Sequence, residues 1–137
     1  MKNTKHLKNC CHLLLGVILL SCAKENKFQN TTWKVKDYFH EAIYKIEEND
    51  DKINVRVIEY DDGTTKINNK NGQIKYKFKD LVKTKKDVLI DGTSGETKLT
   101  NQEKIKISFI HNDTLLVEEL IFNKKNSELW VRLDSVK

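Results

Sequence analysis

The residue best suited to covalent chemistry is Cys22, which lies at the end of an apolar run. The run covers residues 13–20, and Ser21 separates it from the cysteine. A thiolate is the best nucleophile that a protein offers for alkylation, and hydrolysis does not reverse the thioether that forms. The chain has two other cysteines, Cys10 and Cys11, and both lie before the run ends. Cys22 is therefore the candidate for covalent modification.

The segment before Cys22 has the layout of a secretory signal peptide. Its basic residues precede the apolar run and are Lys2, Lys5 and Lys8, and no acid occurs before Glu25. A basic beginning, a short apolar stretch and a small residue at the cut are the marks of such a peptide. The run is too short to span a bilayer, which needs about 20 apolar residues. Removal of residues 1–21 leaves Cys22 without a second cysteine for a disulfide.

The residues Leu19-Leu20-Ser21-Cys22 resemble the lipobox of bacterial lipoproteins. The resemblance implies cleavage before Cys22, a diacylglyceryl group on its sulfur and often a further chain, such as palmitate, on its amine. Two or more chains anchor a protein stably to a bilayer. The protein is then expected in the bacterial cell envelope, and Ala23, in place of an inner-membrane retention aspartate, favours the outer membrane. The alternative is an ordinary secreted protein whose signal happens to end near a cysteine.

The rest of the chain contains no residue pattern typical of catalysis. After the signal peptide, residues 1–21, the only histidines in the sequence are His40 and His111. They are far apart, and no other potential metal ligand lies at the spacing of a zinc site. Nucleophile-elbow, phosphate-loop and His-Glu-x-x-His motifs are absent from the sequence. We therefore expect no enzymatic activity, no metal and no cofactor.

Two stretches deserve a test as ligand contacts. Glu118 and Glu119 are consecutive in an apolar strand, so one of them must face inward unless there is a bulge. An inward glutamate would suit a cationic group, although exposure at a strand end is the simpler expectation. The polar loop over residues 91–97 offers hydroxyls and carboxylates, but a plain turn would have the same composition.

Length and charge indicate one domain and argue against nucleic acid as a partner. Cleavage leaves 116 of the 137 residues, enough for one core. The leader carries three of the 25 basic residues and none of the 20 acids, so the mature chain has a formal charge of +2. Acids gather in residues 41–62 and lysines in residues 70–86. Such rows suit an anionic partner such as a polysaccharide or a membrane face, but they are more often the solvated faces of strands.

From Thr31 onward, alternation of apolar and polar residues predicts antiparallel strands with one wet face. The clearest case sets Ile74, Tyr76 and Phe78 against Lys75, Lys77 and Lys79. Pairs such as Asp91-Gly92 supply turns. Residues 38–46 fit either a helix or a strand, and we favour a strand paired with residues 53–60.

These patterns predict an all-β domain over residues 31–137, joined to the lipid by a tether over residues 22–30. Eight to ten short strands in sequence must curl, and an up-and-down barrel removes exposed edges, with a β-sandwich as the alternative.

The layout resembles the calycins, the lipocalin-like small barrels, in which a tryptophan on the first strand is covered by an arginine near the last. Trp33 and Arg132 occupy those places and would form a cation–π contact that closes the barrel. The family's glycine two positions before the tryptophan is Thr31 here.

The sequence leaves three functions open. The first is binding of a small apolar or amphipathic ligand in the barrel, whose lining is expected to be Val55, Val57, Tyr76, Phe78, Ile107 and Phe109. The second is binding of another envelope protein, as by an inhibitor of a lytic enzyme or an immunity protein. An enzyme is the third and least favoured. A cavity of several hundred Å³ would indicate a ligand carrier, whereas a barrel filled by side chains would indicate recognition at the surface.

Overall fold

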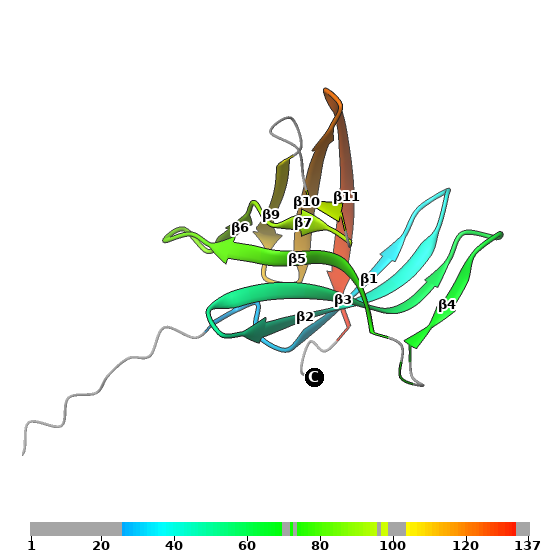
Figure 1. Cartoon of the computed structure of the whole chain (residues 1–137), viewed down its shortest axis with the longest axis horizontal. Coiled ribbons are helices and arrows are strands. Elements are labelled where there is room, and N and C mark those ends of the chain that lie inside the picture. Colours follow the sequence, from blue (N-terminus) through cyan, green and yellow to red (C-terminus); the bar gives the residue numbers. More distant parts are fainter. Residues whose placement is uncertain (1–25, 70–71, 73, 96, 99–103, 134–137) are drawn as a thin grey trace, which may run out of the picture.

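The computed structural model describes residues 26–69, 72, 74–95, 97–98 and 104–133, and it is all-β (Figure 1). The strands are β1 (Thr31–Lys36), β2 (Glu41–Asn49), β3 (Lys52–Asp61), β4 (Lys66–Asn68), β5 (Lys75–Lys83), β6 (Val88–Ile90), β7 (Thr93–Ser94), β8 (Thr97–Lys98), β9 (Lys104–His111), β10 (Thr114–Ile121) and β11 (Lys124–Arg132).

Eight of these strands close into an antiparallel barrel. The sheet runs β3-β2-β1-β11-β10-β9-β6-β5, and pairing of β3 with β5 completes the ring. Neighbours in the ring follow one another along the chain, except where β1 meets β11, so the up-and-down barrel predicted from the sequence is confirmed. Three short strands lie outside the ring. β4 pairs with the last residues of β3, and β7 and β8 form a small hairpin beside β5.

Residues 38–46, for which the sequence allowed either a helix or a strand, belong to a strand from Glu41 onward. Glu41–Asn49 pairs with β3 through a tight turn at Asp50 and Asp51, both of which have positive φ. Alternate side chains of β2 and β3 are buried, as the period-two pattern predicted. Residues 37–40 form the preceding turn rather than part of a helix.

Apolar side chains fill the barrel. Seventeen of them are buried among the described residues, and the two tryptophans, Trp33 and Trp130, are fully enclosed. The buried apolar residues are Phe28, Trp33, Val35, Ala42, Tyr44, Ile46, Ile53, Val55, Val57, Phe78, Leu81, Leu89, Ile105, Ile107, Leu115, Val117 and Trp130. Five of the six residues expected to line the lumen are therefore in this core or packed against it.

The exception is Tyr76, and its displacement follows from bulges in β5. The register against β3 shifts on both sides of Val55, which pairs with Phe78, while Arg56 pairs with Tyr76. Lys77 is the extra residue at the second shift, and a bulge of this kind re-aims side chains. Lys77 consequently contacts interior rings, whereas Tyr76 lies beside outward-facing Arg56. The prediction that Lys77 belongs to a solvated face is wrong.

The barrel has two distinct ends, which we call the base and the mouth. At the base lie the start of β1 and the turns at residues 50–51 and 112–113; at the mouth lie the turns at residues 37–40, 62–65 and 122–123. In Figure 1 the base is on the left, and the tips of the β1–β2 and β3–β4 hairpins point to the right.

The first described residues close the base. Residues 27–30 form a turn, and Phe28 is fully buried with its ring 4.7 Å from that of Phe109. Asn26 donates a hydrogen bond to Glu48 and accepts one from Lys83 Nζ. The segment predicted as a free tether over residues 22–30 thus has its second half packed on the barrel, because Phe28 buries its ring there.

Candidate binding site at the barrel mouth

The chemically richest group inside the barrel surrounds the ammonium of Lys77. Its Nζ lies 2.9 Å from Glu128 Oε1 and 3.2 Å from Glu119 Oε1. Trp130 Nε1 donates to the other oxygen of Glu128 at 2.8 Å. Burial acts to lower the pKa of Lys77, but the negative charges of Glu119 and Glu128 outweigh it and raise that pKa above its usual value. Lys77 is therefore charged at neutral pH, and two carboxylates share one cation.

Three aromatic rings surround the same ammonium. It lies 5.4 Å from the ring centroids of Tyr44 and Phe78 and 5.9 Å from that of Trp130. These distances fall within the range of cation–π attraction. Burial raises the pKa of Tyr44, so its phenol is neutral. Lys77 thus occupies an aromatic cage of the kind that recognises ammonium groups.

His40 joins this cluster to the β1–β2 turn. Its Nδ1 lies 3.2 Å from Asp37, its Nε2 lies 4.0 Å from Glu128, and its ring lies 5.4 Å from that of Tyr60. Among the described residues, Nε2 is buried without a hydrogen-bond partner. Asp37, His40, Glu128, Lys77 and Glu119 therefore form a continuous row of ionisable groups from the turn into the barrel.

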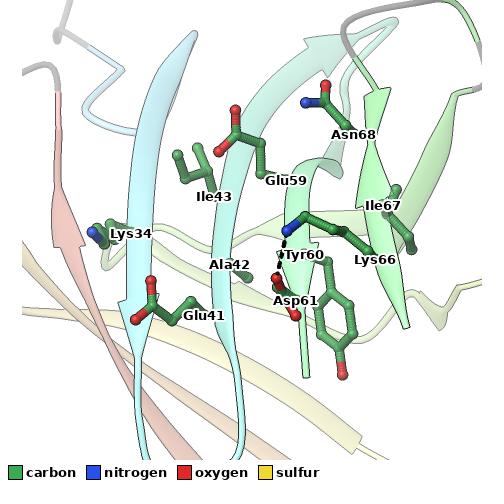
Figure 2. Close-up of a pocket in the computed structure, with 10 residues that line it drawn as sticks. All are labelled: Lys34, Glu41, Ala42, Ile43, Glu59, Tyr60, Asp61, Lys66, Ile67 and Asn68. Atoms are coloured by element: carbon green, nitrogen blue, oxygen red, sulfur yellow. Dashed lines mark ion pairs between the residues drawn. The ribbon is translucent and has the colours of Figure 1, made fainter. Parts of the chain in front are cut away.

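Hollows open around the mouth in the part of the chain that the structure describes. The mouth pocket, of about 380 Å³, is lined by Tyr44, Val57, Tyr60, Ile67, Lys77, Ser94 and Gly95. The outer pocket, of about 210 Å³, lies on the outside of β1 to β4 and is drawn in Figure 2, where the Lys66–Asp61 ion pair is dashed. Both are bounded by Tyr60 and Ile67, which are partners across β3 and β4. The hairpin hollow, of about 520 Å³, lies between the β1–β2 and β3–β4 turns.

The residues singled out in the sequence fall in different places. Arg132 pairs with Trp33 between β1 and β11, and its guanidinium carbon lies 5.8 Å from the ring centroid. Thr31 takes a role of its own, because its hydroxyl accepts the indole N–H of Trp33 at 2.7 Å and donates to the carbonyl of Phe28. His111 is exposed near the base, far from His40. Cys22 lies outside the described residues.

The paired glutamates point to opposite faces, and the simpler expectation that they are exposed at a strand end is wrong for Glu119. Glu119 faces inward and contacts Lys77, whereas Glu118 contacts Lys106 and Lys125 on the outside. In the polar loop, Ser94 and Gly95 reach the mouth pocket. Gly92 there has φ +87, and a Cβ would collide with the carbonyl of Lys79, so only glycine fits this approach.

Sequence reasoning missed Lys77, Glu128, His40 and Tyr60 as members of one site. The period-two pattern of β5 predicts that its lysines face outward. No residue type in the sequence indicates the bulge that turns the Lys77 side chain inward. The one available signal was the inward glutamate, which requires a compensating cation.

No family model matches the chain, and no curated protein or solved structure matches it either. Within the described ranges, no group of three or more His, Cys, Asp or Glu residues is arranged to hold a metal ion. The same part of the chain contains no helix with the length and apolar character needed to cross a membrane.

Proposed function

We propose that this protein is a lipid-anchored, non-enzymatic lipoprotein of the bacterial cell envelope that recognises another protein with the mouth end of its barrel. The packed interior carries this proposal: among the described residues, seventeen apolar side chains are buried in the barrel, and the mouth pocket opens at one end of it. A core packed with side chains favours recognition at the surface over transport of an apolar ligand through the lumen. The outer membrane is the proposed membrane where two are present.

The position of the base supports the same function. Cys22 precedes Asn26 by four residues, which span at most about 14 Å, and Asn26 is bound to Glu48 and Lys83 at the base. A lipid on Cys22 would therefore hold the base toward the bilayer. The mouth, at the other end of the strands, would then face the space where envelope proteins approach.

A small amphipathic ligand is the second candidate, and the mouth pocket favours it. At about 380 Å³ it lies within the usual range of ligand sites, roughly 300–1,000 Å³. The aromatic walls of Tyr44 and Tyr60 would hold the apolar part, and Lys77 marks the polar floor.

Two measurements test the proposal. Metabolic labelling with a tagged fatty acid is expected to mark the native chain and not Cys22→Ala; equal labelling would overturn the anchor. A photo-crosslinking amino acid placed at position 122 or 39 of the lipidated chain in cells is expected to yield a discrete protein adduct, whereas position 110 near the base is not. Adducts only at the base would refute recognition at the mouth. A rise in unfolding temperature with added amphiphiles, without any protein adduct, would favour the second candidate.

A further inference from the structure

We propose that the β1–β2 turn and the hairpin hollow form a docking surface for a basic loop of a partner protein, with a lysine or arginine entering the hollow. The inference rests on the proposed function and names the chemistry of the partner. It is argued from three features: an exposed aromatic pair, the carboxylates of the hollow and the direction in which the turn points.

The aromatic pair consists of Tyr38 and Phe39, which are 95% and 77% exposed. Their rings meet edge to face with centroids 5.3 Å apart. Asp37 Oδ1 accepts the backbone N–H groups of Phe39 and His40 at 2.7 and 2.8 Å, so the turn is held in one conformation. Rigid aromatic residues supply contact area at little cost in conformational entropy and are frequent among residues that dominate interfaces. Neither ring contributes to the barrel core, so their burial would come from a partner.

The hollow beside this pair is strongly acidic. It is lined by Asp37, Tyr38, Phe39, His40, Glu41, Asp61, Asp62 and Gly63. Four of these side chains are carboxylates, and the described lining contains no lysine or arginine. Lys66 pairs with Asp61 from beside the hollow, and His40 contacts Asp37, so the acids still outnumber the cations there. The mature chain as a whole has a formal excess of basic residues, so the acids of this end are a local feature. Potentials of one sign favour a partner of the opposite sign and speed its approach.

Two of these carboxylates, Asp37 and Asp61, have a pKa below its usual value. Burial is the largest single influence on Asp37 and acts to raise its pKa, but the hydrogen bonds from the N–H groups of His40 and Phe39 and the contact with the His40 ring together outweigh it and lower that pKa. The N–H of Gly63 and the ammonium of Lys66 lower the pKa of Asp61. An arginine in the hollow would meet these charges and also the faces of Tyr38 and Phe39, which combines ion pairing with cation–π contact.

Other occupants fit less well. The described residues provide no metal-binding group of His, Cys, Asp or Glu. The turn lies at the opposite end of β2 from the residues that bind Asn26, so the proposed anchor holds it away from lipid headgroups. A protein loop with basic and apolar residues matches both the charge and the rings.

The test is photo-crosslinking at position 39 in the full lipidated chain in cells, with the crosslinked peptide identified by mass spectrometry. The expected adduct joins position 39 to a segment containing lysine or arginine. In the Glu41→Gln/Asp61→Asn variant the yield should fall about tenfold, as expected for the loss of roughly 1.4 kcal/mol. Tyr38→Ala should lower it similarly. Glu118→Gln, an acid on the outer wall, is the matched control and should leave the yield unchanged.

The outcomes separate the two proposals. An adduct at position 122 but none at position 39 would leave recognition at the mouth intact and overturn the docking surface. An adduct at position 39 to a segment without basic residues, or with a yield indifferent to the Glu41/Asp61 change, would also overturn it. Absence of adducts at both positions would overturn the proposed function itself. Circular dichroism of each variant keeps a loss of yield from being mistaken for unfolding.

Discussion

At the residue scale, the ammonium of Lys77 matters because two partly buried carboxylates depend on it. Glu119 and Glu128 contact the same Nζ, and they have no other ammonium or guanidinium group within ion-pair distance among the described residues. The pKa of Lys77 is raised, so its stabilising effect is complete below its usual value and is lost only as pH rises through the higher folded value. Across neutral pH the cluster is therefore constant.

Lys77→Met should reduce the free energy of unfolding by about 2–3 kcal/mol. This is less than the roughly 3–5 kcal/mol of a fully buried pair, because the Lys77 side chain is 17% exposed. Urea unfolding at pH 7 measures the loss, and Lys79→Met is the control. A loss no larger than that of Lys79→Met would contradict the account.

Phe122 has a backbone conformation that lowers the free energy of unfolding. It has φ +47 at the tip of the β10–β11 hairpin, and its ring is 69% exposed. Two-residue turns of this kind favour asparagine or glycine, because left-handed backbone strains other residues by about 1–2 kcal/mol. Phe122→Asn should therefore raise the free energy of unfolding by about 1 kcal/mol in urea titrations. Phe39→Asn, where φ is not positive, should bring no such gain; equal effects would remove backbone strain as the cause.

At the element scale, strands follow from sequence and their irregularities do not. Alternation in β2 and β3 predicted the buried faces, and the two strands are joined by the turn at Asp50 and Asp51. The bulges of β5 arise from fitting its register to β3 and from contacts such as Asp80 N–H to Asn54, which involve residues far apart in the chain. The turn between β10 and β11 consists of Phe122 and Asn123, because pairing with β10 extends β11 to Lys124.

The β3–β4 hairpin depends on Asp62. Its Oδ1 accepts the backbone N–H groups of Thr64 and Thr65 and the hydroxyl of Thr64. The N–H groups of Thr65 and Thr64 lower the pKa of Asp62 to about 2. The ionised carboxylate of Asp62 therefore stabilises the hairpin fully at pH values above the usual aspartate pKa. This stabilisation is lost as the pH falls through about 2.

Asp62→Ala should speed amide hydrogen exchange in residues 62–68 while leaving exchange in β9 and β10 unchanged. Carboxyl ¹³C titration of the native protein should give a midpoint near 2 for Asp62. A midpoint at the ordinary value of 3.8, or exchange rates unaffected by the substitution, would show that the turn does not depend on this side chain.

At the scale of the whole molecule, closure depends on the first and last parts of the described chain. Trp33 and Arg132 join β1 to β11, and Phe28 fills the base beneath Trp33 and Phe109. The sequence identified the two strand residues through a family resemblance, but it gave Phe28 no partner, because a single aromatic in a polar stretch has no periodicity. Its burial becomes visible only once the barrel exists.

Phe28→Ala should lower the free energy of unfolding by about 3–4 kcal/mol, the usual cost of emptying a buried phenylalanine site. A chain beginning at Thr31 should lose at least as much. Urea unfolding compares both with Gln29→Ala, an exposed neighbour expected to change stability by less than about 0.5 kcal/mol. A chain beginning at Thr31 with undiminished stability would show that the segment is only a tether.

The docked turn at residues 26–30 also sets a working height. With Cys22 acylated, only Ala23, Lys24 and Glu25 separate the lipid from the turn. The step from Cys22 to Asn26 spans at most about 14 Å, and the nine residues of β2 add about 30 Å, so the far end of β2 lies within roughly 45 Å of the acylated residue. The barrel would then be held close to the bilayer and not carried on a long flexible linker. It would meet only partners that themselves come close to the membrane surface.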